Sequence, residues 1–133
     1  MTDREEPTWV PEVVVIGAQF DQLLEHGGQQ GLRDKGALLA AALARPKNKF
    51  IYEDADLASL AAAYAFAIAK TSHPFFDGNK RAGWVVALVF LELNGHEVIV
   101  TDNAAIETML AVADGSMSED ALAEWFRVTI SSR

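Results

Sequence analysis

Two almost entirely apolar segments, separated by a polar connection, constrain the fold of this chain most. The first, ADLASLAAAYAFAIAK, covers residues 55–70, and the second covers Trp84–Leu93. A helix that is apolar all round lies inside a protein rather than on its surface. The valine pairs of the second segment could indicate a strand, but Asn79–Leu93 is 15 residues, long for a strand and normal for a helix. Alanine, the strongest helix former, occurs 22 times. We therefore expect an all-α fold built around two buried helices.

Further helices are predicted around this pair, which gives a bundle of about six. The predicted ranges are Val13–His26, ended by Gly27 and Gly28; Ala37–Ala44, closed by Pro46; Thr101 or Asp102 to Val112; and a last helix to about Ile130, capped by Ser116 with Glu119. Asp54 or Asp56 can cap the first buried helix, which runs to about Thr71. The 133 residues are close to the usual size of one domain, so a single domain over residues 1–133 is predicted.

Two short segments have no helical period. Glu97–Val100 is predicted to be extended, and Gly31–Gly36 to be a loop. The polar-to-aromatic segment after Pro46 is predicted to form a short β-hairpin or a flap over a cleft. It consists of Lys47, Asn48, Lys49, Phe50, Ile51 and Tyr52.

Charge and composition exclude several classes of function. The formal net charge of −8 repels phosphate backbones at long range, so direct nucleic-acid binding through a broad basic face is not expected. The longest uncharged apolar run, Ala82–Leu91, is too short to span a bilayer, and the acidic N-terminus lacks the apolar core of an export signal. The chain has no cysteine, which removes thiolate metal sites and thiol nucleophiles and agrees with a reducing cytoplasm. We expect a cytoplasmic protein without membrane contact.

The connection between the two buried helices carries the residues that indicate chemistry. Lys80 and Arg81 occupy the first turn of the second helix, where the helix dipole favours acidic residues. A bound anion, held by the first-turn amides, Asn79 and both basic side chains, would compensate for that mismatch. Gly78 lets the backbone approach the anion.

Two further residues of this connection suit phosphate chemistry. Asp77 has the carboxylate that Mg²⁺ uses together with substrate phosphates. His73 lies just upstream, before Pro74. A histidine, a carboxylate and an anion nest within nine residues indicate phosphoryl or nucleotidyl transfer. The alternative stays open for each residue alone: Asp77 can be only a helix cap, Lys80 and Arg81 only solvated charges, and His73 a hydrogen-bonded loop residue.

The segment His73–Arg81, HPFFDGNKR, closely resembles the Fic/Doc signature in the form found in its Doc, or death-on-curing, branch. The resemblance extends to other segments: Gly31–Asp34, Ala42–Pro46, Ala55–Lys70 and Leu91–Gly95. It implies an all-helical Fic/Doc-like fold whose loop binds a nucleotide. Most Fic proteins transfer AMP and have Gly where this chain has Lys80, and a second Arg where it has Trp84. Both differences favour the Doc branch, which transfers the γ-phosphate of ATP, and the known target class is a threonine of elongation factor Tu.

The resemblance also implies a role for each matching residue. His73 would be the general base, Asp77 would hold Mg²⁺, and Phe75 would anchor the loop. Gly78, Asn79, Lys80 and Arg81 would bind the phosphates of ATP. The segment 47–52 falls where the family has a flap that positions the target peptide.

Partners and competing functions follow from the same resemblance. No S/T-x-x-x-E-G/N inhibitory motif is found, so inhibition is expected from a small antitoxin whose disordered C-terminal segment folds onto this protein, in an apolar groove near the loop. Such a toxin arrests translation. The alternatives are AMP transfer to a protein hydroxyl and a non-catalytic module that acts only in an antitoxin–repressor complex. A metal-dependent nuclease is disfavoured by the net charge.

Overall fold

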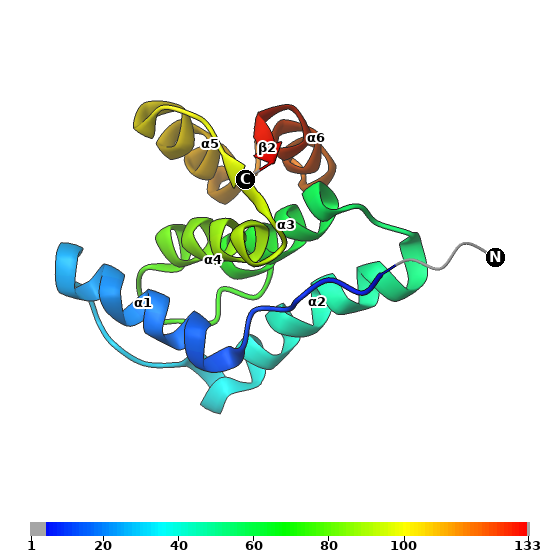
Figure 1. Cartoon of the computed structure of the whole chain (residues 1–133). Helices are drawn as coiled ribbons and strands as arrows, with labels where there is room; N and C mark the ends of the chain where they lie inside the picture. Colours follow the sequence, from blue (N-terminus) through cyan, green and yellow to red (C-terminus); the bar gives the residue numbers. More distant parts are fainter. Residues whose placement is uncertain (1–4, 133) are drawn as a thin grey trace.

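The structure is a computed structural model that describes residues 5–132, and it confirms the predicted all-α fold. Figure 1 shows α3 and α4 in the middle of the molecule, with α1 and α2 on one side and α5 and α6 on the other. A short antiparallel pair, β1 and β2, joins His96 to Ser132. The elements are α1 (Glu12–His26), η1 (Arg33–Gly36), α2 (Ala37–Glu53), α3 (Leu57–Phe66), η2 (Ala67–Thr71), α4 (Asn79–Leu93), β1 (His96–Val98), α5 (Asp102–Asp114), α6 (Glu119–Thr129) and β2 (Ile130–Ser132).

The two apolar segments form the buried centre, as predicted. Every residue from Leu60 to Ala65 is buried, and α3 continues into the single π-helical turn η2. Alanine explains how closely the central helices pack. A Cβ atom added at Gly83 of α4 would lie 2.9 Å from the Ala65 carbonyl oxygen and 3.3 Å from the Ala69 Cβ. The small residues therefore allow the two helix backbones to approach, which fixes the position of the connection between them.

The predicted end of the second helix is wrong. Helix α2 does not stop before Pro46 but continues to Glu53, so residues 47–52 are helical rather than a hairpin or flap. A proline inside a helix removes one backbone hydrogen bond and costs about 3 kcal/mol. Burial of one face offsets this cost: its buried residues are Leu39, Ala42, Pro46 and Lys49, which follow the helical period. The sequence alone does not show this period, because a lysine at position 49 is expected to face solvent.

Of the helix caps that the sequence predicts, one differs in the structure. Asp56 caps α3 by accepting a hydrogen bond from the Ser59 amide, and Thr101 caps α5 through the Ala104 amide. The predicted extended piece at residues 97–100 corresponds to β1. The cap of α6 is Ser118 and not Ser116, whose hydroxyl instead donates to the Ala111 carbonyl at the end of α5.

Candidate functional site

Residues 72–78, called the His73 loop below, join η2 to α4 and are anchored in the core. Phe75 is 1% exposed. The side chain of Asn79, which is 3% exposed, makes two hydrogen bonds to the backbone of Phe75. The Asn79 Oδ1 accepts from the Phe75 amide at 3.0 Å, and the Asn79 Nδ2 donates to the Phe75 carbonyl at 2.9 Å. The Asn79 side chain therefore holds the loop, and Asn79 can offer a ligand its backbone amide.

Residues 29–33, called the brace, run antiparallel to the loop. The Phe76 amide donates to the Gly31 carbonyl at 3.2 Å, and the Arg33 amide donates to the Pro74 carbonyl at 2.8 Å. Leu32 and Phe75 form an isolated bridge between these two bonds. The sequence predicts a loop at Gly31–Gly36; the structure has η1 over Arg33–Gly36, and the contact of residues 31–33 with the His73 loop is not predicted. The available signal was Gly31, whose φ of +131° and close approach to the Phe76 ring suit glycine alone.

His73 is exposed and has an unusual backbone. Its φ is +50°, in the left-handed region that side-chain-bearing residues rarely occupy. The Arg33 Nη1 donates to the His73 carbonyl at 2.6 Å and lies 3.5 Å from the imidazole Nδ1. Partial burial and the Arg33 charge both lower the pKa of His73 below its ordinary value. Both causes favour the neutral imidazole, the state that a general base needs.

Asp77 is held from two sides by residues that sequence reasoning missed. Its carboxylate Oδ2 accepts from the Gln29 amide at 2.5 Å, and its carbonyl accepts from the Gln19 side chain at 3.1 Å. Gln19 is 2% exposed, and a Cβ atom at Gly28 would lie 3.1 Å from the Asp77 Cβ, so the turn after α1 closes tightly over this residue.

The donors present fit one kind of divalent-cation site. Within residues 5–132 no group of three or more histidine, aspartate or glutamate side chains could enclose a metal. Asp77, with one carboxylate oxygen bonded to Gln29, keeps the other oxygen for a ligand. Mg²⁺ commonly binds through one or two carboxylates plus substrate phosphates and water. Asp77 therefore suits a magnesium ion that arrives with a nucleotide.

The first turn of α4 is built for an anion. Gly78 precedes the helix in a left-handed conformation, with φ of +80°, and supplies no capping side chain. The first amides of a helix have no acceptor within the helix, so they remain available. Lys80 and Arg81 are exposed, the first turn holds no acidic residue, and neither side chain forms an ion pair with any residue between 5 and 132. Two cations without an ion-pair partner among residues 5–132 and free amides therefore meet at this helix start.

Residues 47–52 are not brought to this site. They form the last turns of α2, whose first turn follows the brace, and a helix advances about 1.5 Å per residue. Lys49 is 6% exposed and donates to Glu119 of α6 at 2.5 Å, while Ile51 and Tyr52 face solvent. No flap over the His73 loop is formed by this segment.

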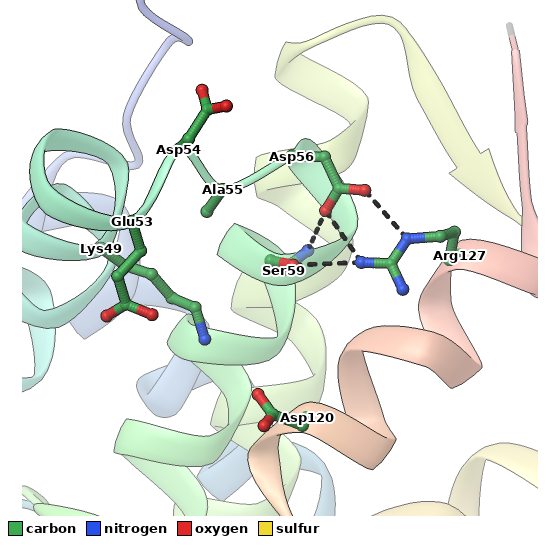
Figure 2. Close-up of a pocket in the computed structure, with 8 residues that line it drawn as sticks. All are labelled: Lys49, Glu53, Asp54, Ala55, Asp56, Ser59, Asp120 and Arg127. Atoms are coloured by element: carbon green, nitrogen blue, oxygen red, sulfur yellow. Dashed lines mark hydrogen bonds and ion pairs between the residues drawn. The ribbon is translucent and has the colours of Figure 1, made fainter.

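Among the pockets that residues 5–132 form, two of about 310 Å³ each differ in character. The polar pocket in Figure 2 lies at the N-terminal end of α3, the end opposite the His73 loop, and is lined by Lys49, Glu53, Asp54, Ala55, Asp56, Ser59, Asp120 and Arg127. The second is an apolar groove between α1 and the brace. It is lined by Val13, Ile16, Gly17, Gln19, Phe20, Gln30, Gly31, Leu32 and Phe75. Because the groove includes Phe75, it adjoins the His73 loop.

Comparison with known proteins gives three findings. A sequence model of the Fic/DOC family matches residues 9–91, which contain the brace, the loop and most of α4. The "Protein kinase doc" of Escherichia phage P1 is 33% identical over 114 residues, covering 85% of this chain and 88% of that protein. The "Toxin Doc" of Mycolicibacterium smegmatis is 44% identical over 71 residues, so the match spans about half of either chain, 52% here and 53% there. Among residues 5–132, no helix has the length and apolar character needed to cross a membrane.

Proposed function

The chain belongs to the Fic/DOC family, and from that premise we propose that it is the toxin of a toxin–antitoxin pair. Its activity would be transfer of the ATP γ-phosphate to a protein hydroxyl. The names of the two relatives, a toxin and a protein kinase, support this proposal. Lys80 and Trp84 support the kinase branch over AMP transfer, because they stand where most AMP-transferring relatives have Gly and a second Arg.

The observation that carries the proposal is the positive charge of Lys80 and Arg81, which have no ion-pair partner among residues 5–132, at the start of the helix that follows the His73 loop. Phosphoryl transfer depends mainly on positioning and on stabilising phosphate charge. The amides that follow Gly78, together with Lys80 and Arg81, would bind the phosphates of ATP, with Asn79 contributing its amide. A magnesium ion held by Asp77 would neutralise part of the phosphate charge.

His73 would act on the target hydroxyl. As the hydroxyl oxygen bonds to the γ-phosphorus, the bond from that phosphorus to the leaving oxygen of ADP breaks, and the imidazole accepts the hydroxyl proton. A base of this kind contributes about 10²–10⁴-fold to the rate. The lowered pKa of His73 supports the role, because the imidazole is free to accept a proton at neutral pH.

The proposed partners follow from the family and from the apolar groove. We place a threonine of elongation factor Tu as the acceptor, in the cytoplasm, so that modification arrests translation. The groove would receive the antitoxin's C-terminal segment, because Val13, Ile16 and Phe20 expose apolar surface beside the loop.

The test uses ATP labelled at either the α or the γ phosphate, with magnesium and elongation factor Tu. Label transferred from the γ position supports the kinase, and label from the α position supports AMP transfer instead. His73→Ala is the matched inactive control. No transfer from either position, together with unimpaired growth when the protein is expressed without an antitoxin, would contradict both and favour the non-catalytic module.

A further inference from the structure

The backbone of His73 has an unfavourable conformation, which contacts with other residues must stabilise. A non-glycine residue at φ of +50° is uncommon, and a residue that precedes a proline is normally restricted to extended conformations. The His73 amide makes only a long bond, 3.4 Å, to the Ala67 carbonyl. The His73 carbonyl, by contrast, accepts a short bond of 2.6 Å from the Arg33 guanidinium.

Arg33 reaches His73 from a separate part of the chain and is fixed there by its own backbone. Its amide donates to the Pro74 carbonyl at 2.8 Å, so main chain and side chain hold consecutive carbonyls of the loop. The guanidinium forms no ion pair with any residue between 5 and 132, so no carboxylate competes for it.

We propose that Arg33 is a positioning residue for His73: its side chain holds the His73 carbonyl and thereby sets the left-handed turn that presents the imidazole. This inference rests on the proposed function only where it concerns the rate. The contact itself is independent of what is transferred, because phosphate transfer and AMP transfer would both use His73 as the base.

The position of the guanidinium also affects the charge of the imidazole. A guanidinium only donates hydrogen bonds, so its approach to Nδ1 is compatible with a neutral imidazole whose Nδ1 carries a lone pair. A protonated ring would place two positive charges side by side. After partial burial, this repulsion is the second cause of the lowered pKa of His73.

The other charged groups around His73 are engaged elsewhere or lie further along the chain. Lys70, on the turn η2 packed behind it, reaches the Ala113 carbonyl at 3.5 Å. The Asp77 carboxylate is bonded to the Gln29 amide at the far end of the loop. Asp34 and Lys35 follow Arg33 in η1 and are exposed. Arg33 is therefore the charge expected to govern the imidazole.

The experiment compares Arg33→Gln and Arg33→Lys with the control Lys35→Gln, which removes one positive charge two residues away. All three keep the backbone bond from residue 33 to Pro74, so the brace is retained, and thermal unfolding checks the fold. The His73 imidazole is titrated by NMR in each variant, with His26 and His96 as internal references. Arg33→Gln should raise the pKa of His73, whereas Arg33→Lys and Lys35→Gln should leave it low.

The kinetic readout separates positioning from general destabilisation. Arg33→Gln should lower kcat about 10–100-fold at pH 7 and leave the KM for ATP unchanged, because misplacement of a reacting group costs rate rather than nucleotide binding. The loss should be larger at pH 6 than at pH 8, since the variant imidazole protonates at higher pH. Arg33→Lys should recover only part of kcat, because an ammonium lacks the planar fork.

An unchanged His73 titration in Arg33→Gln, or an altered KM with an unchanged kcat, would overturn the inference. If the wild-type protein transfers no label at all, the proposed function fails. The titration still decides whether Arg33 controls His73, so the two failures remain distinguishable.

Discussion

Charged residues lie near both ends of the buried helix α3. Near one end they form ion pairs, and near the other two cations have no ion-pair partner among the described residues. At its N-terminal end, called the paired end, Arg127 of α6 forms a two-pronged pair with Asp56 at 2.9 and 3.1 Å, and Lys49 is paired with Glu119 (Figure 2 shows the first pair). At the other end, called the loop end, Lys80 and Arg81 form no ion pair within residues 5–132.

Backbone strain follows the same division. Asp54 at the paired end also has a positive φ, +51°, but it directly follows α2, where left-handed residues commonly end helices. His73, at +50°, follows Ser72 at the end of η2, but unlike Asp54 it precedes a proline, which normally restricts a residue to extended conformations. Such strain tends to occur at functional sites, where surrounding contacts maintain it.

The contrast shows why the polar pocket is not the candidate site. The two cations of that pocket are already engaged, Arg127 with Asp56 and Lys49 with Glu119, so an added anion would have to displace a carboxylate. At the loop end the matching partner is missing from the described chain, and the proposed ATP would supply it. The contrast predicts that variants at the loop end change activity, whereas variants at the paired end change stability.

The largest effect is expected for His73→Ala. Loss of the general base should lower the transfer rate about 10²–10⁴-fold. The temperature of half-unfolding should hardly change, because the His73 side chain is exposed. Phosphotransfer and thermal unfolding are measured on the same preparation. A variant that keeps full activity would remove His73 from the mechanism and break the comparison.

At the paired end, Glu119→Gln should act on stability alone. The carboxylate accepts from Lys49 at 2.5 Å and from Arg45 at 2.9 Å, and Lys49 is nearly buried. Leaving a buried ammonium without its partner should cost about 2–3 kcal/mol, less than for a fully buried pair because Arg45 is half-exposed. Urea unfolding gives the free energy. The rate per folded molecule should match wild type, and a fall in kcat would mean that the two ends are coupled.

Lys80→Gln should move activity and stability in opposite directions. Removing a cation from the first turn of α4 relieves an unfavourable interaction with the helix dipole, which should stabilise the protein by about 0.3–1 kcal/mol. The same change should raise the KM for ATP, because a phosphate contact is lost. Lys47→Gln, in an exposed position inside α2, is the control. Loss of stability in Lys80→Gln would show that the charge is already compensated.

What the sequence could predict depends on how local the determining contacts are. The range of α4, Asn79–Leu93, is predicted correctly to the residue. The signals that set this range lie within the helix or directly beside it: an apolar run, Gly78 before it, and Asn94-Gly95, which ends it. The candidate loop could be identified for the same reason, because the residues that mark it, His73–Arg81, follow one another in the sequence.

Contacts between distant residues account for what was missed. Arg33 and His73 are 40 positions apart, and Lys49 and Glu119 are 70 apart. A lysine whose partner lies 70 positions away looks like a surface residue, so the apolar face of α2 seemed to end at Pro46. The support of Asp77 by the Gln19 side chain and the Gln29 backbone amide was hidden likewise, because neither an uncharged side chain nor a backbone group gives a periodic signal.

The last prediction concerns the pH dependence of the Asp56–Arg127 pair. The hydrogen bonds from Arg127 hold the pKa of Asp56 at about 2, below the ordinary 3.8. Because the folded pKa is depressed, the stabilisation is full above about pH 4 and is lost as the pH falls towards 2. Solvent screening of this half-exposed pair limits the stabilisation to about 1 kcal/mol.

Asp56→Asn isolates this contribution, since asparagine can still cap α3. The difference in unfolding free energy between wild type and Asp56→Asn should be about 1 kcal/mol at pH 6 and should shrink towards zero between pH 4 and pH 2. Urea unfolding at several pH values measures it, and the transfer rate at pH 7 should be equal in both proteins. A difference that stays constant with pH would mean that Arg127 and Asp56 do not pair in solution, and Arg127 would then be paired with Glu124 alone.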